Sequence, residues 1–146
     1  HFHCSNKYLA LTAGFGIIFV DVFCDKYSMT DYVFYFLFLL ILKHTVCDYF
    51  LQTLYHIRNK GIYMAMGGLT HSGHHALGTL LCCFAVTSNW SVSLFIAAID
   101  FVCHYHIDYI KTRFGPKDIN HPHYWRWFGI DQTAHMLTYL FLSTII

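Results

Sequence analysis

The stretch YVFYFLFLLILKHTVCDYFLQTL, residues 32–54, decides the class of fold that this chain can adopt. Its first eleven residues carry no charge, and the charged side chains that follow are Lys43 and Asp48. A helix of about 17–25 apolar residues crosses a bilayer core of about 30 Å. Because unpaired backbone groups are costly in lipid, such a segment forms a helix rather than an open strand. The stretch therefore predicts a transmembrane helix over residues 32–54.

Four further apolar segments accompany this helix along the chain. Ser88 and Asn89 predict a tight turn between two of them. We expect an all-α polytopic membrane protein with a single transmembrane domain over residues 1–146. Its architecture is an antiparallel four-helix transmembrane bundle plus one peripheral N-terminal helix, the first segment being short for a full span. The four segments cover residues 9–23, 69–87, 92–110 and 130–146.

The composition supports this class. Hydrophobic residues make up 56% of the chain and charged residues only 12%, whereas soluble domains carry about 25% charged residues. Such a chain lacks the polar surface of a soluble domain or a disordered tail. A net charge of +1 gives no electrostatic basis for binding nucleic acid. The 12 histidines outnumber the 9 Lys and Arg residues, and all eight acidic residues are Asp, which indicates metal chemistry inside a membrane.

The basic residues predict how the bundle is oriented. When the five segments are threaded alternately through a membrane, seven Lys and Arg residues fall on one side and only Lys26 falls on the other. Lys and Arg accumulate on the cytoplasmic side of membrane proteins, so we expect a cytoplasmic N-terminus. The seven residues are Lys7, Arg58, Lys60, Lys111, Arg113, Lys117 and Arg126.

Potential metal ligands recur in four of the five segments with one spacing. The two members of each pair are four residues apart, which places both side chains on one face of a helix. Pairs on facing helices are how helical bundles build dinuclear metal sites. The four pairs are His44 with Asp48, His71 with His75, His104 with Asp108, and Asp131 with His135.

These pairs share one depth, because each lies near the predicted cytoplasmic end of its helix. In an antiparallel bundle the eight side chains can therefore meet in one layer. Five imidazoles and three carboxylates without a thiolate suit Zn²⁺, Fe²⁺ or Mn²⁺. Eight ligands exceed one tetrahedral site, so the sequence predicts two divalent metal ions. A proton relay or a polar network that packs the bundle is the alternative for such intramembrane groups.

Two ions about 3.5–4 Å apart can activate a water and stabilise a phosphoryl oxygen or an oxyanion. The leading hypothesis is a membrane-embedded, metal-dependent hydrolase that acts on a lipid or lipid-linked phosphate or ester from the cytoplasmic leaflet. Asp131 or Asp108 would serve as the base. Lys43, which precedes His44, would counter a substrate phosphate, with snorkelling toward the interface as the equal alternative.

The ordered motifs resemble the DUF3307 family of small bacterial and phage-borne membrane proteins, over about residues 39–146. The resemblance implies a membrane location, in a bacterial inner membrane, and one shared polar site, but no reaction. The chain is also loosely similar to membrane-bound metal-dependent hydrolases of the YdjM type. The motifs are Lys43-His44 to Asp48-Tyr49-Phe50-Leu51-Gln52, His71 to His75, His104 to Asp108 with Lys111, and Asp131-Gln132 to His135.

Other functions remain open beside the hydrolase. The run His71-Ser72-Gly73-His74-His75 matches the HxxHH box of membrane desaturases and hydroxylases, which keeps a di-iron oxidase, hydroxylase or desaturase of lipids as the second hypothesis. A third hypothesis is a non-catalytic subunit of a larger membrane complex, or a metal or proton transporter. The expected partners are the bilayer and a lipid-like substrate, and not nucleic acid.

Overall fold

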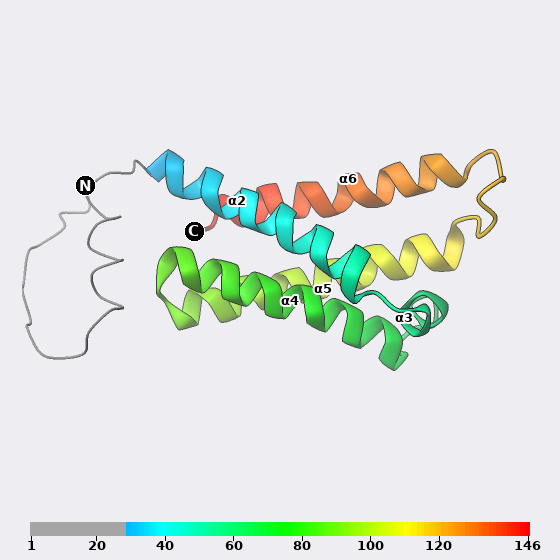
Figure 1. Ribbon diagram of the computed structural model, residues 1–146, viewed down its shortest axis with the longest axis horizontal. Helices are drawn as coiled ribbons and strands as arrows, with labels where there is room; N and C mark the ends of the chain where they lie inside the picture. The colour runs from blue at the N-terminus through cyan, green and yellow to red at the C-terminus, as the bar shows by residue number, and fades with distance from the viewer. Residues whose placement is uncertain (1–28) are drawn as a thin grey trace, which may run out of the picture.

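The structure is a computed structural model that describes residues 29–146, and the helix expected over residues 9–23 lies outside this part. The described residues form five α-helices and one π-helical segment, with no strand among them (Figure 1). The all-α prediction is therefore confirmed for this part of the chain. The elements are α2 (Met29–Val46), η1 (Cys47–Leu51), α3 (Leu54–Asn59), α4 (Met66–Thr87), α5 (Trp90–Phe114) and α6 (Tyr124–Ser143).

The four long helices form an antiparallel bundle. Helix α2 packs against α4 and α6, and α5 packs against α4 and α6, so the helices close into a ring (Figure 1). The short helix α3 lies beside the start of α4, at the end where α5 finishes and α6 begins. We call this end of the bundle the α3 end. The opposite end contains the start of α2 and the turn between α4 and α5.

The first long helix ends earlier than the sequence predicted. Helix α2 continues as the π-helical segment η1 only to Leu51, and Gln52 is extended with φ −75° and ψ 115°. Thr53 then begins α3 with a reciprocal cap, because its backbone N–H donates to the His56 ring at 3.0 Å and its side chain accepts from the His56 backbone. This local cap favours a new helix over continuation of the old one.

The other long helices extend beyond their apolar segments at the α3 end. Helix α5 continues to Phe114, where Gly115-Pro116 stops it. Helix α6 begins at Tyr124 rather than at Ile130 and ends at Ser143 rather than at Ile146. Hydrophobicity predicts the part of a helix that fits a bilayer core, and it does not report the polar or aromatic turns that continue the same helix.

The turn between α4 and α5 is confirmed. Ser88 ends α4 in the left-handed conformation with φ 52°. The Asn89 side chain then caps α5 by accepting hydrogen bonds from the backbone N–H groups of Ser91 and Val92, at 3.0 and 3.2 Å. A short cap of this kind brings α5 back antiparallel to α4.

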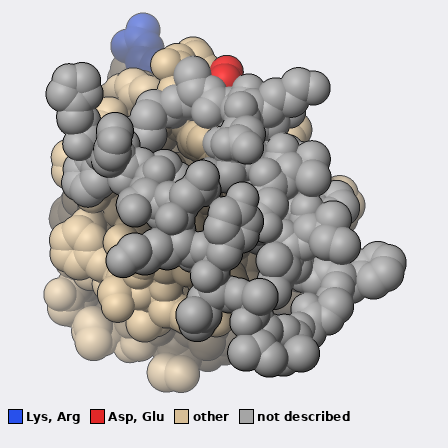
Figure 2. All heavy atoms as spheres, turned by 90° about the vertical axis from the view of Figure 1, so that its left-hand side faces the viewer, with Lys and Arg blue, Asp and Glu red and all other residues tan. Residues whose placement is uncertain are grey.

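The interior of the bundle is more polar than its surface. Among the described residues, fifteen buried side chains are polar or charged and nine are apolar. Large apolar side chains are exposed on every long helix, including Phe38 at 60%, Leu81 at 57%, Leu94 at 58% and Leu137 at 60%. Figure 2 views the molecule from the end opposite α3, where the visible described atoms are nearly all uncharged. A water-soluble bundle has the reverse distribution.

Two helical stretches in the described part are long and apolar enough to cross a membrane. They are Thr30–Leu51, with 22 residues, and Trp90–Phe114, with 25 residues, and their apolar 18-residue windows have mean hydropathies of 1.5 and 1.3. Buried core helices of soluble proteins pass the same criterion, so these two stretches give weak support for a membrane protein. The bundle with four membrane crossings stays a prediction.

Candidate metal centre

The structure brings together all eight side chains that the spacing singled out. Each long helix contributes one pair, and seven of the eight residues are buried, with Asp48 half-buried. We call this set the eight-residue cluster, and it lies inside the bundle toward the α3 end. Its members are His44, Asp48, His71, His75, His104, Asp108, Asp131 and His135.

Asp48 is the centre of one half of the cluster. Its Oδ2 lies 3.1 Å from Nε2 of His44, and its Oδ1 lies 3.2 Å from Nε2 of both His71 and His75. Asp48 belongs to η1, and π-helical turns inside α-helices are frequent at functional sites. One carboxylate therefore faces three imidazoles from two helices.

Asp108 is the centre of the other half. Its Oδ2 lies 3.2 Å from Nε2 of His71 and 3.6 Å from Nε2 of His104. Its Oδ1 accepts a hydrogen bond from Lys60 Nζ at 3.0 Å and lies 3.9 Å from Nε2 of His135. His71 therefore touches both carboxylates and joins the two halves.

The ligand atoms fall into three overlapping groups, and within each group they all lie within 4.8 Å of one another. His104 is shared by the first two groups and His135 by the last two. Three such groups offer positions for more than one ion. The groups are Asp48 with His71, His75 and His104; His44 with His104 and His135; and Asp108 with Asp131 and His135.

Several cluster atoms have no hydrogen-bond partner within residues 29–146. Neither ring nitrogen of His104 forms a hydrogen bond there, although only 1% of this side chain is exposed and its Nε2 lies 3.6 Å from Asp108 Oδ2. Oδ1 of Asp131, which lies 3.7 Å from His135 Nε2, and Nδ1 of His75 also form none. Buried polar atoms normally have a partner, and each exception requires an explanation. Cations bound at these atoms would supply one, so the donor set fits metal ions.

Other polar side chains orient members of the cluster. Nδ1 of His44 is hydrogen-bonded to the Tyr139 hydroxyl at 2.8 Å. Gln132 Oε1 lies 3.3 Å from the other ring nitrogen of His44, and Gln52 Nε2 donates to Asp48 Oδ1 at 3.3 Å. Metal-binding histidines commonly use one nitrogen for the ion and the other for such a contact.

Lys43 occupies a different position from the one that sequence reasoning gave it. Its Nζ donates to Asp100 Oδ2 at 2.7 Å and to the backbone oxygen of His75 at 3.2 Å, and the residue is 7% exposed. Thr79 donates to the same Asp100 oxygen at 2.6 Å. Because Asp100 already matches the charge of Lys43, the geometry favours a structural role. A contact between Lys43 and a substrate phosphate stays a prediction.

Lys60 is the lysine that the structure places at the cluster, and sequence reasoning used it only for orientation. It follows α3 and reaches Asp108 because the chain passes close to the start of α4. A Cβ at Gly67 would lie 2.5 Å from the Cβ of Asn59, the residue before Lys60, so glycine there permits this approach. His56 in α3 is buried, which lowers the pKa of its ring, and His71 lies beside it. Gly67 and Gly68, which precede His71, were the feature of the sequence that could have predicted this close approach.

The remaining histidines of the described part do not belong to the cluster. His74 lies beside His56, with 5.5 Å between the ring centroids, and its Nδ1 has no hydrogen-bond partner. His106 is exposed, and its Nδ1 lies 2.8 Å from the backbone oxygen of Val102. His121 and His123 are exposed in the loop before α6. The division that spacing made between cluster and other histidines therefore agrees with the geometry.

Fold and site together define a class of protein: an all-α bundle whose apolar helices enclose paired histidines and aspartates. The chain belongs to the DUF3307 family, described as proteins of unknown function, whose family model matches residues 36–146. All eight cluster residues lie inside the matched range. No curated protein and no solved structure matches the chain. The looser similarity to hydrolases of the YdjM type stays a prediction.

Proposed function

We propose that this protein is an integral membrane hydrolase whose eight-residue cluster holds two divalent metal ions and acts on a lipid or lipid-linked phosphate or ester. The observation that carries the proposal is the convergence of eight ligand side chains in three overlapping groups, together with buried His104, both of whose ring nitrogens form no hydrogen bond within residues 29–146. A polar network that only packed the bundle would be expected to pair those nitrogens.

The charges of the cluster support bound cations. Its three carboxylates face one ammonium group, that of Lys60, which leaves two negative charges unmatched when the imidazoles are neutral. Buried charges of one sign are costly without counter-charges. One divalent ion would balance this set. A second ion would make the site positive, which favours an anionic substrate such as a phosphate.

The membrane location rests on the reversed polarity of the bundle. Its outer faces are apolar and its interior is polar, as expected where lipid replaces water around the helices. Helices α4 and α6, with 22 and 20 residues, are about 33 and 30 Å long at about 1.5 Å per residue. Each length is sufficient to cross a hydrocarbon core of about 30 Å.

The proposed orientation rests on basic residues at the α3 end. Six of the seven residues expected on the cytoplasmic side lie there within the described part, and Lys7 lies outside it. At the opposite end, ranges 29–35, 84–94 and 139–146 contain no Lys or Arg. This asymmetry supports a cytoplasmic α3 end. A bacterial inner membrane remains part of the proposal.

When bound, the two ions would supply a Lewis acid and an activated water. Within residues 29–146, Asp131 Oδ1 and Asp108 Oδ2 each accept no hydrogen bond. Asp131 is the better candidate for the base, because Asp108 is held by the Lys60 ammonium group, and a neighbouring cation makes a carboxylate a poorer proton acceptor. Gln132 Nε2 donates to the other oxygen of Asp131 at 3.2 Å and so holds the carboxylate in place. Tyr139 fixes the ring of His44 in the same way.

Hydrolysis is favoured over transport by the interior on the far side of the cluster. Beyond the Lys43–Asp100 pair, the buried core of the described bundle is an apolar group that includes Phe36, Leu40 and Ile96. A transporter needs polar groups that continue to the other surface. The site is therefore proposed to exchange with one side of the membrane only.

The proposal is tested by the metal content of the purified protein in detergent. We expect about two ions per chain, zinc or manganese, by elemental analysis. The parent protein should also release inorganic phosphate from phosphatidic acid in mixed micelles. His104→Ala should lose at least one ion and this phosphatase activity. His106→Ala is the matched control, because His106 lies on the same helix but is exposed and outside the cluster.

Two results would overturn the proposal. If the purified protein is folded but contains no metal, the proposal of a dinuclear site is rejected. Iron accompanied by oxygen consumption would replace hydrolysis with the di-iron alternative.

A further inference from the structure

A cleft of about 630 Å³ opens at the α3 end of the bundle. It lies between α3 and the loop after it, the end of α5, and the start of α6. Five of its lining residues are basic, and none is a carboxylate. The basic residues are Arg58, Lys60, Lys111, Arg113 and Lys117.

The cleft adjoins the eight-residue cluster. Two of its lining residues, Gln52 and Lys60, also touch cluster carboxylates, with Gln52 Nε2 3.3 Å from Asp48 Oδ1 and Lys60 Nζ 3.0 Å from Asp108 Oδ1. Lys111 lies one helical turn beyond Asp108. Gln52 and Lys60 therefore lie between the cleft and the eight-residue cluster.

The carboxylates of the described residues leave most of the positive charge of the cleft unpaired. In residues 29–146, Lys60 is the basic residue of the cleft that forms an ion pair, and Arg58, Arg113 and Lys117 pair with no carboxylate. Lys111 Nζ lies 5.7 Å from the centre of the Phe128 ring. A concave surface lined by charges of one sign concentrates ligands of the opposite sign.

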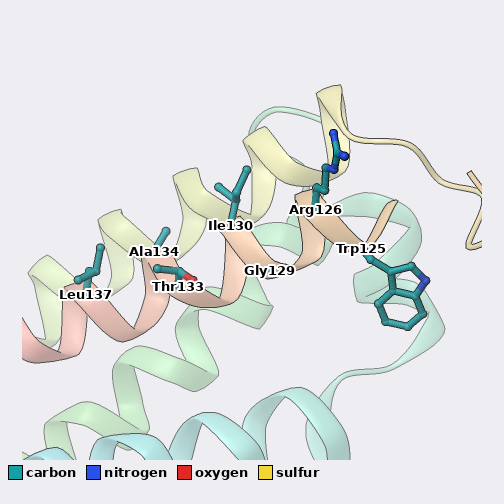
Figure 3. A pocket seen from close by; sticks show the side chains of 7 residues that line it. All are labelled: Trp125, Arg126, Gly129, Ile130, Thr133, Ala134 and Leu137. Atoms are coloured by element: carbon teal, nitrogen blue, oxygen red, sulfur yellow. The ribbon is translucent and has the colours of Figure 1, made fainter. Parts of the chain in front are cut away.

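A second groove offers a useful contrast. It runs along the outer face of α6, where Arg126, Ile130, Ala134 and Leu137 follow one another (Figure 3). Its lining is mainly apolar, and none of its lining residues belongs to the cluster. It has one basic residue, Arg126, at the same end of the bundle as the cleft. Of the two openings, only the basic cleft leads to the site.

We infer that the basic cleft binds the phosphate group of the substrate and presents it to the cluster. The inference rests on the proposed function and adds the substrate class, a phosphate ester rather than a neutral ester. Arg58 and Arg113 are exposed at its rim and suit phosphate oxygens through paired N–H donors. Lys60 lines the cleft and also donates to the cluster carboxylate Asp108.

The chemistry leaves two sources for the phosphate, a lipid headgroup or a soluble phosphate ester. The probes are short-chain phosphatidic acid in neutral detergent micelles, inorganic phosphate, and diacylglycerol as the neutral counterpart. Tighter binding of phosphatidic acid than of inorganic phosphate assigns the lipid source, and equal binding assigns the soluble source. Both support the cleft, whereas binding of diacylglycerol as tight as that of phosphatidic acid would overturn it.

The decisive variant is Arg58→Gln combined with Arg113→Gln, with titration calorimetry of the metal-loaded protein as the measurement. Loss of two charge-assisted contacts should raise the Kd for phosphatidic acid by about tenfold or more. Arg126→Gln, which removes a charge at the same end but outside the cleft, should leave the Kd unchanged. An equal rise in both variants would show general attraction to surface charge and would overturn the inference.

Metal content measured in the same samples separates this inference from the proposed function. Cleft-dependent binding by a protein without metal would retain the cleft and reject the hydrolase. If the protein contains two ions per chain but the Arg58 and Arg113 substitutions leave the Kd unchanged, the metal centre is retained and the role of the cleft is rejected.

Discussion

Lys43 and Lys60 are both buried in the bundle, each beside an aspartate, and the surroundings of the two pairs differ. Lys43 meets Asp100 at 2.7 Å, and Lys60 meets Asp108 at 3.0 Å. Asp100 accepts from Lys43 and Thr79 through Oδ2, and no histidine of residues 29–146 forms an ion pair with it. Asp108 instead faces three imidazoles in addition to Lys60. The first pair is matched charge for charge, and the second is part of a larger polar group.

This difference in surroundings distinguishes a structural ion pair, Lys43–Asp100, from an ion pair that belongs to the candidate metal site, Lys60–Asp108. The Lys43–Asp100 pair joins α2 to α5 and lies against the apolar half of the interior, so removing one partner leaves a buried charge with nothing to replace it. Around Asp108, several groups compete for the same oxygens. A cation can displace one competitor there without leaving the carboxylate unmatched.

The largest effect is expected where the matched pair is broken. Lys43→Met leaves Asp100 buried, with 1% of its side chain exposed, and without a counter-charge. We expect a loss of about 3–5 kcal/mol in the free energy of unfolding. Chemical unfolding in detergent, followed by circular dichroism, measures it. Metal content should stay at the level of the parent protein.

The double variant Lys43→Met with Asp100→Leu is the control, since it removes both charges and should recover most of the stability. A Lys43→Met protein that remains stable but no longer releases phosphate would contradict the structural role. Lys43 would then be the substrate-binding residue that the sequence predicted.

The sequence was sufficient to predict that the eight side chains come together, because the spacing of residues along a helix determines which side chains share a face. His44 and Asp48, like each of the other three pairs, are four residues apart, and that spacing alone places them on one face. Antiparallel packing then brings the four pairs to one level, as the three overlapping ligand groups show. Only the fold class, and not the contacts, had to be correct for this prediction.

The contacts of the two lysines could not be predicted in the same way. The position of Lys60 depends on the path of residues 52–65, where the chain turns on both sides of the short helix α3 and glycines set the approach to α4. The Lys43–Asp100 pair joins residues 57 positions apart on different helices. Both depend on packing between elements, which a single sequence does not encode locally.

A smaller effect tests the residue that connects the two regions. Tyr139 is fully buried, its hydroxyl is hydrogen-bonded to His44 Nδ1 at 2.8 Å, and Lys43 Nζ lies 4.6 Å from its ring centre. Tyr139→Phe removes only the contact to the cluster. We expect metal affinity to fall by about 10–100-fold, as for other residues that orient metal ligands. Competition with a chromophoric zinc chelator measures it.

Tyr49→Phe is the matched control for Tyr139, because Tyr49 is 73% exposed and should not affect the affinity. If Tyr139→Phe loses stability while its zinc affinity equals that of the parent, the hydroxyl serves packing alone. His44 would then not depend on Tyr139 as a ligand.

The smallest effect has the opposite sign and compares the two lysines directly. Lys60 Nζ holds Asp108 Oδ1, so its positive charge competes with a metal ion for the carboxylate. Lys60→Met should therefore bind zinc more tightly by roughly fivefold, because two unit charges at about 4 Å interact by about 1 kcal/mol even in water. Lys43→Met should show no such gain, since Asp100 lies outside all three ligand groups. Weaker zinc binding by Lys60→Met would mean that Lys60 supports Asp108 rather than competes for it, and the distinction between the two pairs would fail.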